Sequence, residues 1–329
     1  MTTPNHPAVL TGLALGDALG APWEPRAEDP QDVNPPGLQG WGGDMVDGHL
    51  GPAGTTTDDT GMAAALARAM VGEPAREYIP DHVATEYLEW YLREKGARGI
   101  GGTIRASLER FMGTRRRVAR RLAEGRIGNG TAMRVAPLGL RYWGQPMVLE
   151  ITVRQDSLIT HNSPEAVAGS MAVAGAVALA IQLPKKPPTA RLLALRDMLR
   201  PGFRNTRTWW ALGGLTELLG GTATRYRGEG EALERFFIRR AQNVGVDGDV
   251  TATVYTALLA AALTPNFRIE DPAARGQDLF RRGARLAVRM GGDTDTRAAI
   301  TGAIIGAAVG REGLPPEWVS KVGGSEEFL

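Results

Sequence analysis

Two short acidic segments hold the residues whose types and spacing could do chemistry. The first reads TTDDT over residues 56–60, and the second reads GGDTDT over residues 291–296. Each segment lies at or just before the start of a predicted helix, where one carboxylate or hydroxyl oxygen accepts unsatisfied backbone N–H groups. Helix capping therefore explains one acceptor in each segment and leaves the remaining carboxylates unexplained.

The surplus of carboxylates favours a site for divalent cations. Neighbouring carboxylates repel one another unless positive charge neutralises them. Carboxylate and hydroxyl oxygens are the ligands that Mg²⁺, Mn²⁺ and Ca²⁺ prefer. The sequence has no cysteine and only four histidines, so it excludes a thiolate site and disfavours zinc. Simple helix capping remains the alternative for each segment taken alone.

Asp17 and Glu24 are further acids near the N-terminus. Asp17 lies inside an apolar stretch of Gly, Ala and Leu residues, where a carboxylate needs a partner or a structural role such as accepting backbone hydrogen bonds. Glu24 follows that stretch and precedes a segment rich in glycine and proline. Solvation is the ordinary explanation for such a glutamate, but its place beside that segment makes it a candidate for the site.

A glycine-rich turn and a histidine could take part in ligand binding. Residues 125–131 read GRIGNGT ahead of a predicted helix, and such a turn presents backbone N–H groups to an anion, commonly a phosphate. His161 precedes a long apolar helix whose candidate cap is Ser163. A histidine at such a place is more often structural than catalytic. The candidate binding residues are Gly125, Arg126, Ile127, Asn129, Gly130 and His161.

Length and composition indicate a globular protein with a sizeable core. The chain has 329 residues, 43% hydrophobic and 22% charged, and its 38 basic and 36 acidic residues leave a net charge of +2. A charge so close to balance does not by itself indicate nucleic-acid binding. The first seven residues lack the features of a secretory signal, and we expect a cytoplasmic protein. Residues 166–183 are long and apolar enough to raise the question of a membrane span, but a buried central helix is favoured.

The apolar periodicity predicts an all-α fold, a single compact orthogonal multi-helix domain over residues 1–329. Strand signals are nearly absent. Gly302, Gly306 and Gly310 stand at four-residue intervals and would let helix backbones approach closely. Residues 26–54, rich in glycine and proline, are a candidate lid loop. The predicted helices cover residues 7–20, 58–71, 81–95, 101–112, 130–143, 147–159, 164–183, 189–199, 207–220, 229–243, 249–264, 275–290 and 295–310.

Read together, five motifs resemble the ADP-ribosylglycohydrolase family, which includes the dinitrogenase reductase-activating glycohydrolases. The order of the five motifs is more specific than any one of them, and the resemblance runs from Gly12 to about Trp318. They read GLALGDALGAPWE over residues 12–24, TTDDTGMAAALA over 56–67, GNGTAMRVAPLGL over 128–140, THNSPEAVAGSMAVAGAVA over 160–178 and GGDTDTRAAITGAIIGA over 291–307.

The resemblance implies an all-α enzyme with a dinuclear metal cleft that binds ADP-ribose. It implies hydrolysis of an N- or O-glycosidic bond at the ribose anomeric carbon, which releases ADP-ribose from a modified acceptor. The glycine-rich turn, with Asn129, and His161 would line the ADP-ribose pocket. Glu24 is our candidate for the carboxylate that assists bond cleavage, with Asp58 or Asp59 as alternatives. Two divalent cations, Mg²⁺ or Mn²⁺, would be held by Thr57, Asp58, Asp59, Asp293, Asp295 and Thr296.

One departure from the family pattern bears on the substrate. Many relatives have an Asp-Ile-Gly segment where this chain has Gly99, Ile100 and Gly101, so the family's aspartate is missing while every matched ligand position is intact. The acceptor carrying ADP-ribose could be a protein, a nucleic acid or a small ester, and no membrane partner is expected. The arginines of residues 115–121 would usually form a solvated face. A non-catalytic ADP-ribose-binding or structural relative is the alternative function.

Overall fold

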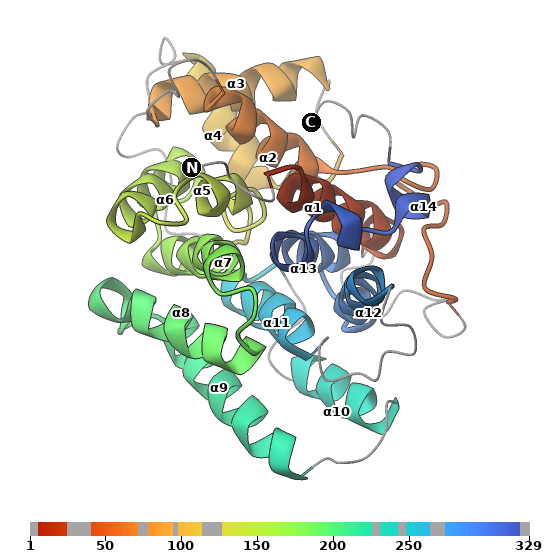
Figure 1. Ribbon diagram of the computed structural model, residues 1–329. Coiled ribbons are helices and arrows are strands. Elements are labelled where there is room, and N and C mark those ends of the chain that lie inside the picture. The colour runs from red at the N-terminus through yellow and green to blue at the C-terminus, as the bar shows by residue number, and fades with distance from the viewer. Residues whose placement is uncertain are drawn as a thin grey trace.

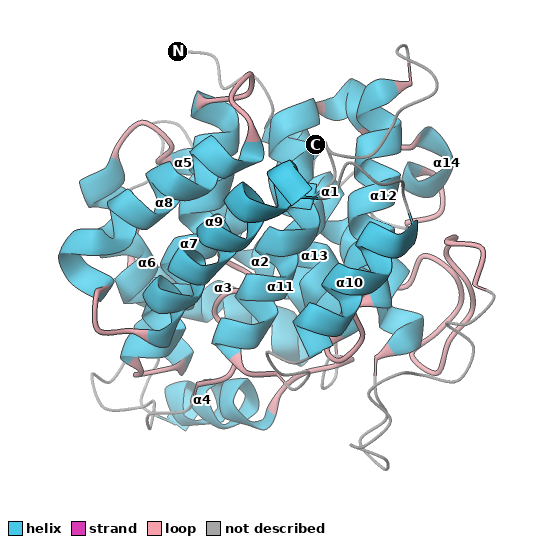
Figure 2. Ribbon diagram, turned by 90° about the horizontal axis from the view of Figure 1, so that it is seen from below, coloured by secondary structure: helices cyan, strands magenta, loops and turns pink. Residues whose placement is uncertain are grey.

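Helices form the regular structure of this protein (Figure 1). The computed structural model describes residues 6–24, 41–71, 78–94, 98–113, 127–225, 231–242, 248–263 and 274–322. Within these ranges there is no strand, only isolated bridges that pair Gly48 with Gly51 and Gly128 with Asp249, so the predicted all-α class is confirmed (Figure 2). The helices are α1 (His6–Gly20), α2 (Asp58–Ala69), α3 (Pro80–Arg93), α4 (Gly102–Gly113), α5 (Ala136–Arg141), α6 (Pro146–Thr160), α7 (Pro164–Gln182), α8 (Pro188–Phe203), α9 (Arg207–Arg225), α10 (Glu231–Gln242), α11 (Val250–Leu263), α12 (Arg275–Arg289), α13 (Thr294–Val309) and α14 (Pro316–Val319), with 3₁₀ turns η1 (Ala21–Trp23) and η3 (Arg311–Gly313).

Two helices differ most from the sequence-based expectation, and Gly310 lies outside the helix predicted to end there. The helix predicted over residues 130–143 is shorter, because residues 130–134 form turns and α5 begins only at Ala136. Helix α14 was not predicted, since four residues are too few to show a helical period. Gly310 lies beyond the end of α13 with a φ of 72°, a left-handed conformation that glycine adopts without strain.

Helix α7 lies in the core. It is long and apolar enough to span a membrane by length and composition, but 78% of its apolar window is buried inside the protein. It packs against α5, α6, α8, α11 and α13. The prediction of a buried central helix is therefore confirmed.

Helices α1 and α13 lie side by side at the distance of backbone contact (Figure 1). A Cβ atom added at Gly302 would lie 2.0 Å from the carbonyl oxygen of Gly12, and one added at Gly16 would lie 2.0 Å from that of Ala298. A Cβ atom at Gly306 would lie 2.3 Å from the carbonyl oxygen of Ala8. The close approach predicted for Gly302 and Gly306 is confirmed, and the α1–α13 contact depends on small residues in both helices.

The candidate lid loop is described only in its second half, because residues 26–40 lie outside the described residues. In the segment 41–54, Trp41 donates from Nε1 to the carbonyl oxygen of Asp44 at 2.8 Å, and Asp44 accepts from Trp318 Nε1 at 2.7 Å. Arg285 Nε donates to the carbonyl oxygen of Gly43 at 2.6 Å. Hydrogen bonds therefore hold this segment against α12 and α14.

We expect Gly302→Ala to lower the free energy of unfolding by about 1–3 kcal/mol, because the new methyl group would force α1 and α13 apart. Gly214→Ala in α9 is the matched control, since a Cβ atom there meets nothing within 4 Å. That variant should gain about 0.5–1 kcal/mol from helix propensity. Urea unfolding measures both, and equal midpoints for the two variants would contradict the backbone contact.

Candidate active site

Asp17, on α1, fixes the start of α2. Its carboxylate accepts from the backbone N–H of Thr57 at 3.0 Å and from that of Thr60 at 3.1 Å. The hydroxyl groups of Thr57 and Thr60 also donate to it. Thr57 Oγ1 in turn accepts from the backbone N–H of Asp59 at 3.4 Å and caps α2. The buried carboxylate thus has the structural role predicted for it, and it sets the direction in which the next two acids point.

Asp58 and Asp59 follow that cap and are buried at the first turn of α2. The backbone N–H of Asp58 donates to the carbonyl oxygen of Arg98 at 3.1 Å. Asp59 Oδ1 accepts from Thr296 Oγ1 at 3.2 Å across 237 residues of sequence. Asp59 Oδ2 is buried and has no hydrogen-bond partner. The two acidic segments that the sequence singled out therefore meet in space.

Asp293, Asp295 and Thr296 form the second half of this acidic cluster. Asp293 caps α13, with its Oδ1 3.4 Å from the backbone nitrogen of Thr296. Asp295 Oδ1 accepts from the same N–H at 2.9 Å. Asp293 Oδ2 accepts from Asn129 Nδ2 at 2.6 Å. The capping explanation is correct for Thr57 and for Asp293, and it leaves Asp58 and the second oxygen of Asp59 unused.

Burial and mutual repulsion hold protons on these acids. Burial, with the charges of Asp293 and Asp58, raises the pKa of Glu24 to about 8. Burial, with the charges of Asp17 and Asp293, raises the pKa of Asp58 to about 8. The pKa values of Asp59 and Asp295 lie well above the usual range, first because of burial and then because of the other carboxylates. The acidic cluster therefore has too little positive charge nearby to balance its carboxylates.

The donor chemistry of the cluster fits hard divalent cations. Over the described ranges, no group of three or more His, Asp or Glu side chains is already arranged to hold an ion. The unpartnered Oδ2 of Asp59 and the raised pKa values of its neighbours nevertheless indicate oxygen donors that lack a charge partner. Threonine hydroxyls beside them extend the set of oxygen ligands that Mg²⁺ or Mn²⁺ accepts.

The glycine-rich turn lies against these acids. Of its predicted binding residues, Gly125 and Arg126 lie outside the described residues. Asn129 donates from its backbone N–H to the carbonyl oxygen of Gly248 at 3.0 Å, and Ile127 accepts from the backbone N–H of Val250 at 2.9 Å. Asn129, already bonded to Asp293, therefore joins the turn to the acidic cluster.

His161 lies on the other side of the turn. It follows the last residue of α6 and is 2% exposed. Its Cε1 lies 3.2 Å from a Cβ atom built at Gly130, and its Nε2 lies 3.4 Å from one built at Gly128. The structure therefore brings together the histidine and the turn that the sequence selected separately.

Sequence reasoning missed the residues that support the turn. Gly248 and Thr253, at the start of α11, bond to the backbone and side chain of Asn129. Arg134 and Asp156 form a fully buried ion pair at 2.9 Å behind it. The available signals were weak: two charged residues in otherwise apolar helical patterns, and Asp249, which caps α11 through the N–H groups of Thr251 and Ala252.

Comparison with known proteins identifies the family of this chain. Residues 7–329 match the sequence profile of the family described as ADP-ribosylglycohydrolase. The chain belongs to the ADP-ribosylglycohydrolase family. This membership confirms the predicted fold and enzyme class, a hydrolase of ADP-ribosyl bonds.

Several relatives cover nearly all of the chain. The ADP-ribosylarginine hydrolase Tri1 of Pseudomonas putida is 29% identical over 97% of this chain and 74% of its own length. The ADP-ribosylhydrolase ARH3 of Bos taurus is 28% identical over 97% of this chain and 88% of its own. The ADP-ribosyl-[dinitrogen reductase] glycohydrolase of Rhodospirillum rubrum is 28% identical over 94% and 87%. A solved ADP-ribosylglycohydrolase-related protein complex superposes with a TM-score of 0.66 at 27% identity, over 99% of this chain and 94% of that one.

Gly99, the position at which the family resemblance led us to expect an aspartate, lies directly beside Asp58. Its φ is 80°, and a Cβ atom there would lie 2.7 Å from Asp58 Oδ1. The missing aspartate would therefore have stood within the acidic cluster. In this chain, glycine at position 99 places no side chain beside Asp58 Oδ1.

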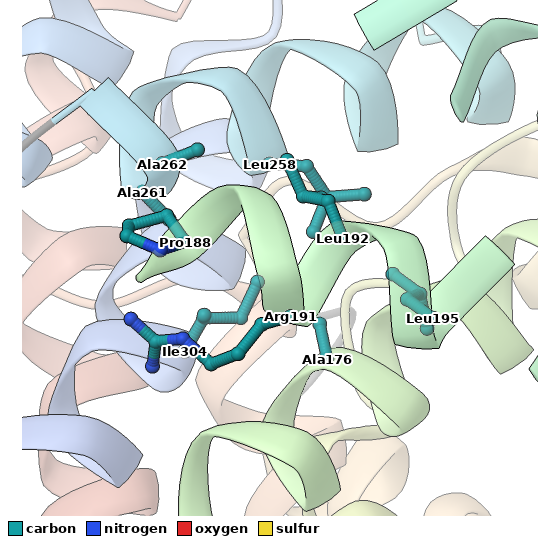
Figure 3. Close-up of a pocket in the computed structure, with 9 residues that line it drawn as sticks. All are labelled: Ala176, Pro188, Arg191, Leu192, Leu195, Leu258, Ala261, Ala262 and Ile304. Atoms are coloured by element: carbon teal, nitrogen blue, oxygen red, sulfur yellow. The ribbon is translucent and has the colours of Figure 1, made fainter. Parts of the chain in front are cut away.

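A separate apolar pocket lies between α7, α8, α11 and α13 (Figure 3). Its volume is about 40 Å³, and none of the predicted site residues lines it. Ala176, Leu192, Leu258 and Ile304 are among its apolar walls, and Arg191 is its one charged residue. Its lining contains no carboxylate or hydroxyl group for acid–base or metal chemistry, so the pocket does not compete with the acidic cluster as the active site.

We expect Gly99→Ala to lower the free energy of unfolding by about 1–2 kcal/mol, because the left-handed backbone is strained for alanine and its methyl group would push Asp58 aside. Gly101→Ala is the control two residues away, where a Cβ atom meets nothing within 4 Å. Thermal unfolding in EDTA separates the two. Equal melting temperatures would show that position 99 does not restrain the cluster.

The acidic cluster should make the cation-free protein less stable at higher pH. The folded pKa values of Glu24 and Asp58 are about 8, above the values near 4 of unfolded chains, so between these limits the folded state binds more protons. The free energy of unfolding should therefore fall as pH rises from about 5 to 8, by up to about 1.4 kcal/mol per pH unit for each of the two groups. Urea unfolding in EDTA measures the slope. Asp58→Asn should flatten it, whereas Asp197→Asn, exposed on α8, should not.

Proposed function

We propose that this chain removes ADP-ribose from a modified acceptor in the cytoplasm, by metal-dependent hydrolysis of the N- or O-glycosidic bond at the ribose anomeric carbon. Family membership supports the reaction class. The observation that carries the proposal is the meeting of two acidic segments from α2 and α13, through Thr296 and Asp59, beside a glycine-rich turn joined to Asp293 by Asn129. Such a site combines charged groups for catalysis with backbone groups for an anionic ligand.

Two divalent cations, Mg²⁺ or Mn²⁺, are the cofactors we propose. When bound, they would neutralise the carboxylates and supply Lewis-acid chemistry that orients ribose hydroxyls and activates water. The donor chemistry described above supports this assignment. The residues that would hold them are Thr57, Asp58, Asp59, Asp293, Asp295 and Thr296.

Glu24 is the carboxyl group we propose for assisting bond cleavage. It follows the 3₁₀ turn at the end of α1, and a pKa of about 8 lets it hold a proton at neutral pH in the cation-free protein. A protonated carboxyl can protonate the departing acceptor, and its ionised form can stabilise the positive charge that develops on the ribose carbon. Asp58 and Asp59 are the alternatives for this role.

The remaining groups would bind and orient ADP-ribose. The backbone of residues 127–130 and the ring of His161 would contact the ligand, and Asn129 would hold Asp293 in place through its 2.6 Å hydrogen bond. Asp17 keeps the start of α2 fixed while the ligand binds. Orientation of this kind lowers the entropic part of the barrier.

The acceptor we propose is an ADP-ribosylated protein. The relatives named above act, by their names, on ADP-ribosylarginine and on ADP-ribosyl dinitrogen reductase. Gly99 places no carboxylate beside Asp58, so an arginine linkage is not the only candidate. Serine-linked protein, nucleic-acid ends and small ADP-ribose esters belong in the same test.

Release of free ADP-ribose tests this proposal. We expect release from at least one of the arginine-, serine-, nucleic-acid- or ester-linked substrates with Mg²⁺ or Mn²⁺, and none with EDTA. Asp293→Asn should abolish release and weaken Mn²⁺ binding measured by calorimetry, and Glu24→Gln should lower kcat at least about 100-fold while Mn²⁺ still binds.

Asp197→Asn on α8 serves as the control that makes the same change in charge away from the site, and it should retain full activity. Near wild-type turnover of Glu24→Gln with cations bound would remove Glu24 from the mechanism. Binding of ADP-ribose without release from any substrate would favour the non-catalytic reader over the hydrolase.

A further inference from the structure

A fully buried ion pair lies behind the glycine-rich turn. Arg134 Nε and Asp156 Oδ2 are 2.9 Å apart, and both side chains have 0% exposure. Arg134 Nη2 donates to the carbonyl oxygen of Asp156 at 2.8 Å, and the hydroxyl of Tyr87 donates to Asp156 Oδ1 at 2.6 Å. The Tyr87 ring lies under the guanidinium at 4.7 Å. Since a buried ion pair often adds no stability over an apolar pair, this one calls for another role.

The remaining guanidinium nitrogen, Arg134 Nη1, is directed at the site. It donates to the carbonyl oxygen of Gly130 at 3.3 Å, within the turn. It also donates to Thr160 Oγ1 at 2.9 Å. Thr160 Oγ1 is in turn 3.0 Å from His161 Nδ1. A chain of hydrogen bonds therefore runs from the ion pair to the histidine.

The direction of these hydrogen bonds follows from the chemistry of arginine. A guanidinium has no acceptor and stays protonated in proteins, so Thr160 Oγ1 must accept from Arg134. Thr160 is fully buried, and its hydroxyl oxygen lies 3.0 Å from His161 Nδ1. A Thr160 hydroxyl that donates to Nδ1 leaves the proton of the neutral imidazole on Nε2.

We infer that Arg134 is a positioning residue which, through Thr160, fixes His161 in the Nε2–H tautomer and makes it a hydrogen-bond donor. The Nε2 edge lies beside Gly128 of the turn, where a ligand oxygen would be bound. The identity of that ligand rests on the proposed function, in which Nε2–H donates to an oxygen of ADP-ribose. His161 then binds substrate and does not take a proton through Nε2.

The tautomer can be measured in the resting protein without any ligand. The chain has only four histidines, so ¹⁵N-labelled imidazole spectra can be assigned with a His161→Gln reference. We expect the Nε2–H pattern of long-range couplings for His161 in the wild type. Thr160→Val should convert it to a mixture of tautomers, while Thr160→Ser, which keeps the hydroxyl, should restore the wild-type pattern.

Thr152→Val is the matched control on the same helix. Thr152 is also buried, but its hydroxyl donates only to the helix carbonyls of Val148 and Leu149. The Thr152→Val variant should therefore leave the His161 spectrum unchanged. If Thr160→Val and Thr152→Val both retain the Nε2–H pattern, or if the wild type shows Nδ1–H, the inference is overturned.

Binding of ADP-ribose then separates this inference from the proposed function. Thr160→Val should weaken ADP-ribose binding about tenfold and raise KM more than it changes kcat, because a binding contact is lost. If the Nε2–H tautomer depends on Thr160 but the protein neither binds ADP-ribose nor cleaves any substrate, the proposed function is refuted and the positioning role of Thr160 is intact. If the protein releases ADP-ribose and the His161 tautomer is unchanged in Thr160→Val, the proposed function is supported and the positioning role is refuted.

Discussion

The backbone contact between α1 and α13 is the constraint on which the site depends. Gly12 and Gly302 set the distance between the helices, and Gly20 continues the contact to the start of α13, where a Cβ atom would lie 2.3 Å from the carbonyl oxygen of Thr294. Thr294 Oγ1 also donates to the carbonyl oxygen of Gly20 at 2.9 Å. The chain leaves α1 toward Glu24 at the same point, so the packing that closes the fold also brings Glu24 to the acids of α13.

The close packing of α1 and α13 explains where the acids lie. Their uncompensated charge explains why that place is useful for function. Arg134 lowers the pKa of Asp58, but this effect is smaller than those of burial and of the neighbouring carboxylates, and its guanidinium is bonded to Asp156. The interior thus contains a balanced ion pair beside an unbalanced group of acids. Arg134 forms its ion pair with Asp156 rather than with an acid of the cluster. Keeping Arg134 apart from the cluster leaves carboxylates that bind protons or cations, which is typical of functional sites that are maintained at a cost in stability.

The sequence predicted the parts of this arrangement that have a local signature. Helical periodicity placed twelve of the thirteen predicted helices within about five residues of their observed bounds, and the surplus of acids was enough to mark Asp58, Asp59 and Asp293 as candidate ligands. It could not predict the pairing of Asn129 with Gly248, because two segments of no unusual composition meet only after α11 has packed. The helix expected from residue 130 fails for the same reason, since tertiary hydrogen bonds hold that stretch as turns.

The glycine-rich turn connects the proposed ligand site to the acidic cluster. On one side Asn129 connects it to Asp293, and on the other Gly130 and His161 connect it to Arg134. Arg134 is held by Asp156 in the core, and Asn129 is held by Gly248 and Thr253 as well as by Asp293. A ligand bound at the turn, as proposed above, would act on Asp293 through Asn129. Binding energy gained far from the reacting bond can in this way orient a carboxylate at the bond, which is how binding contributes to the rate of a chemical step.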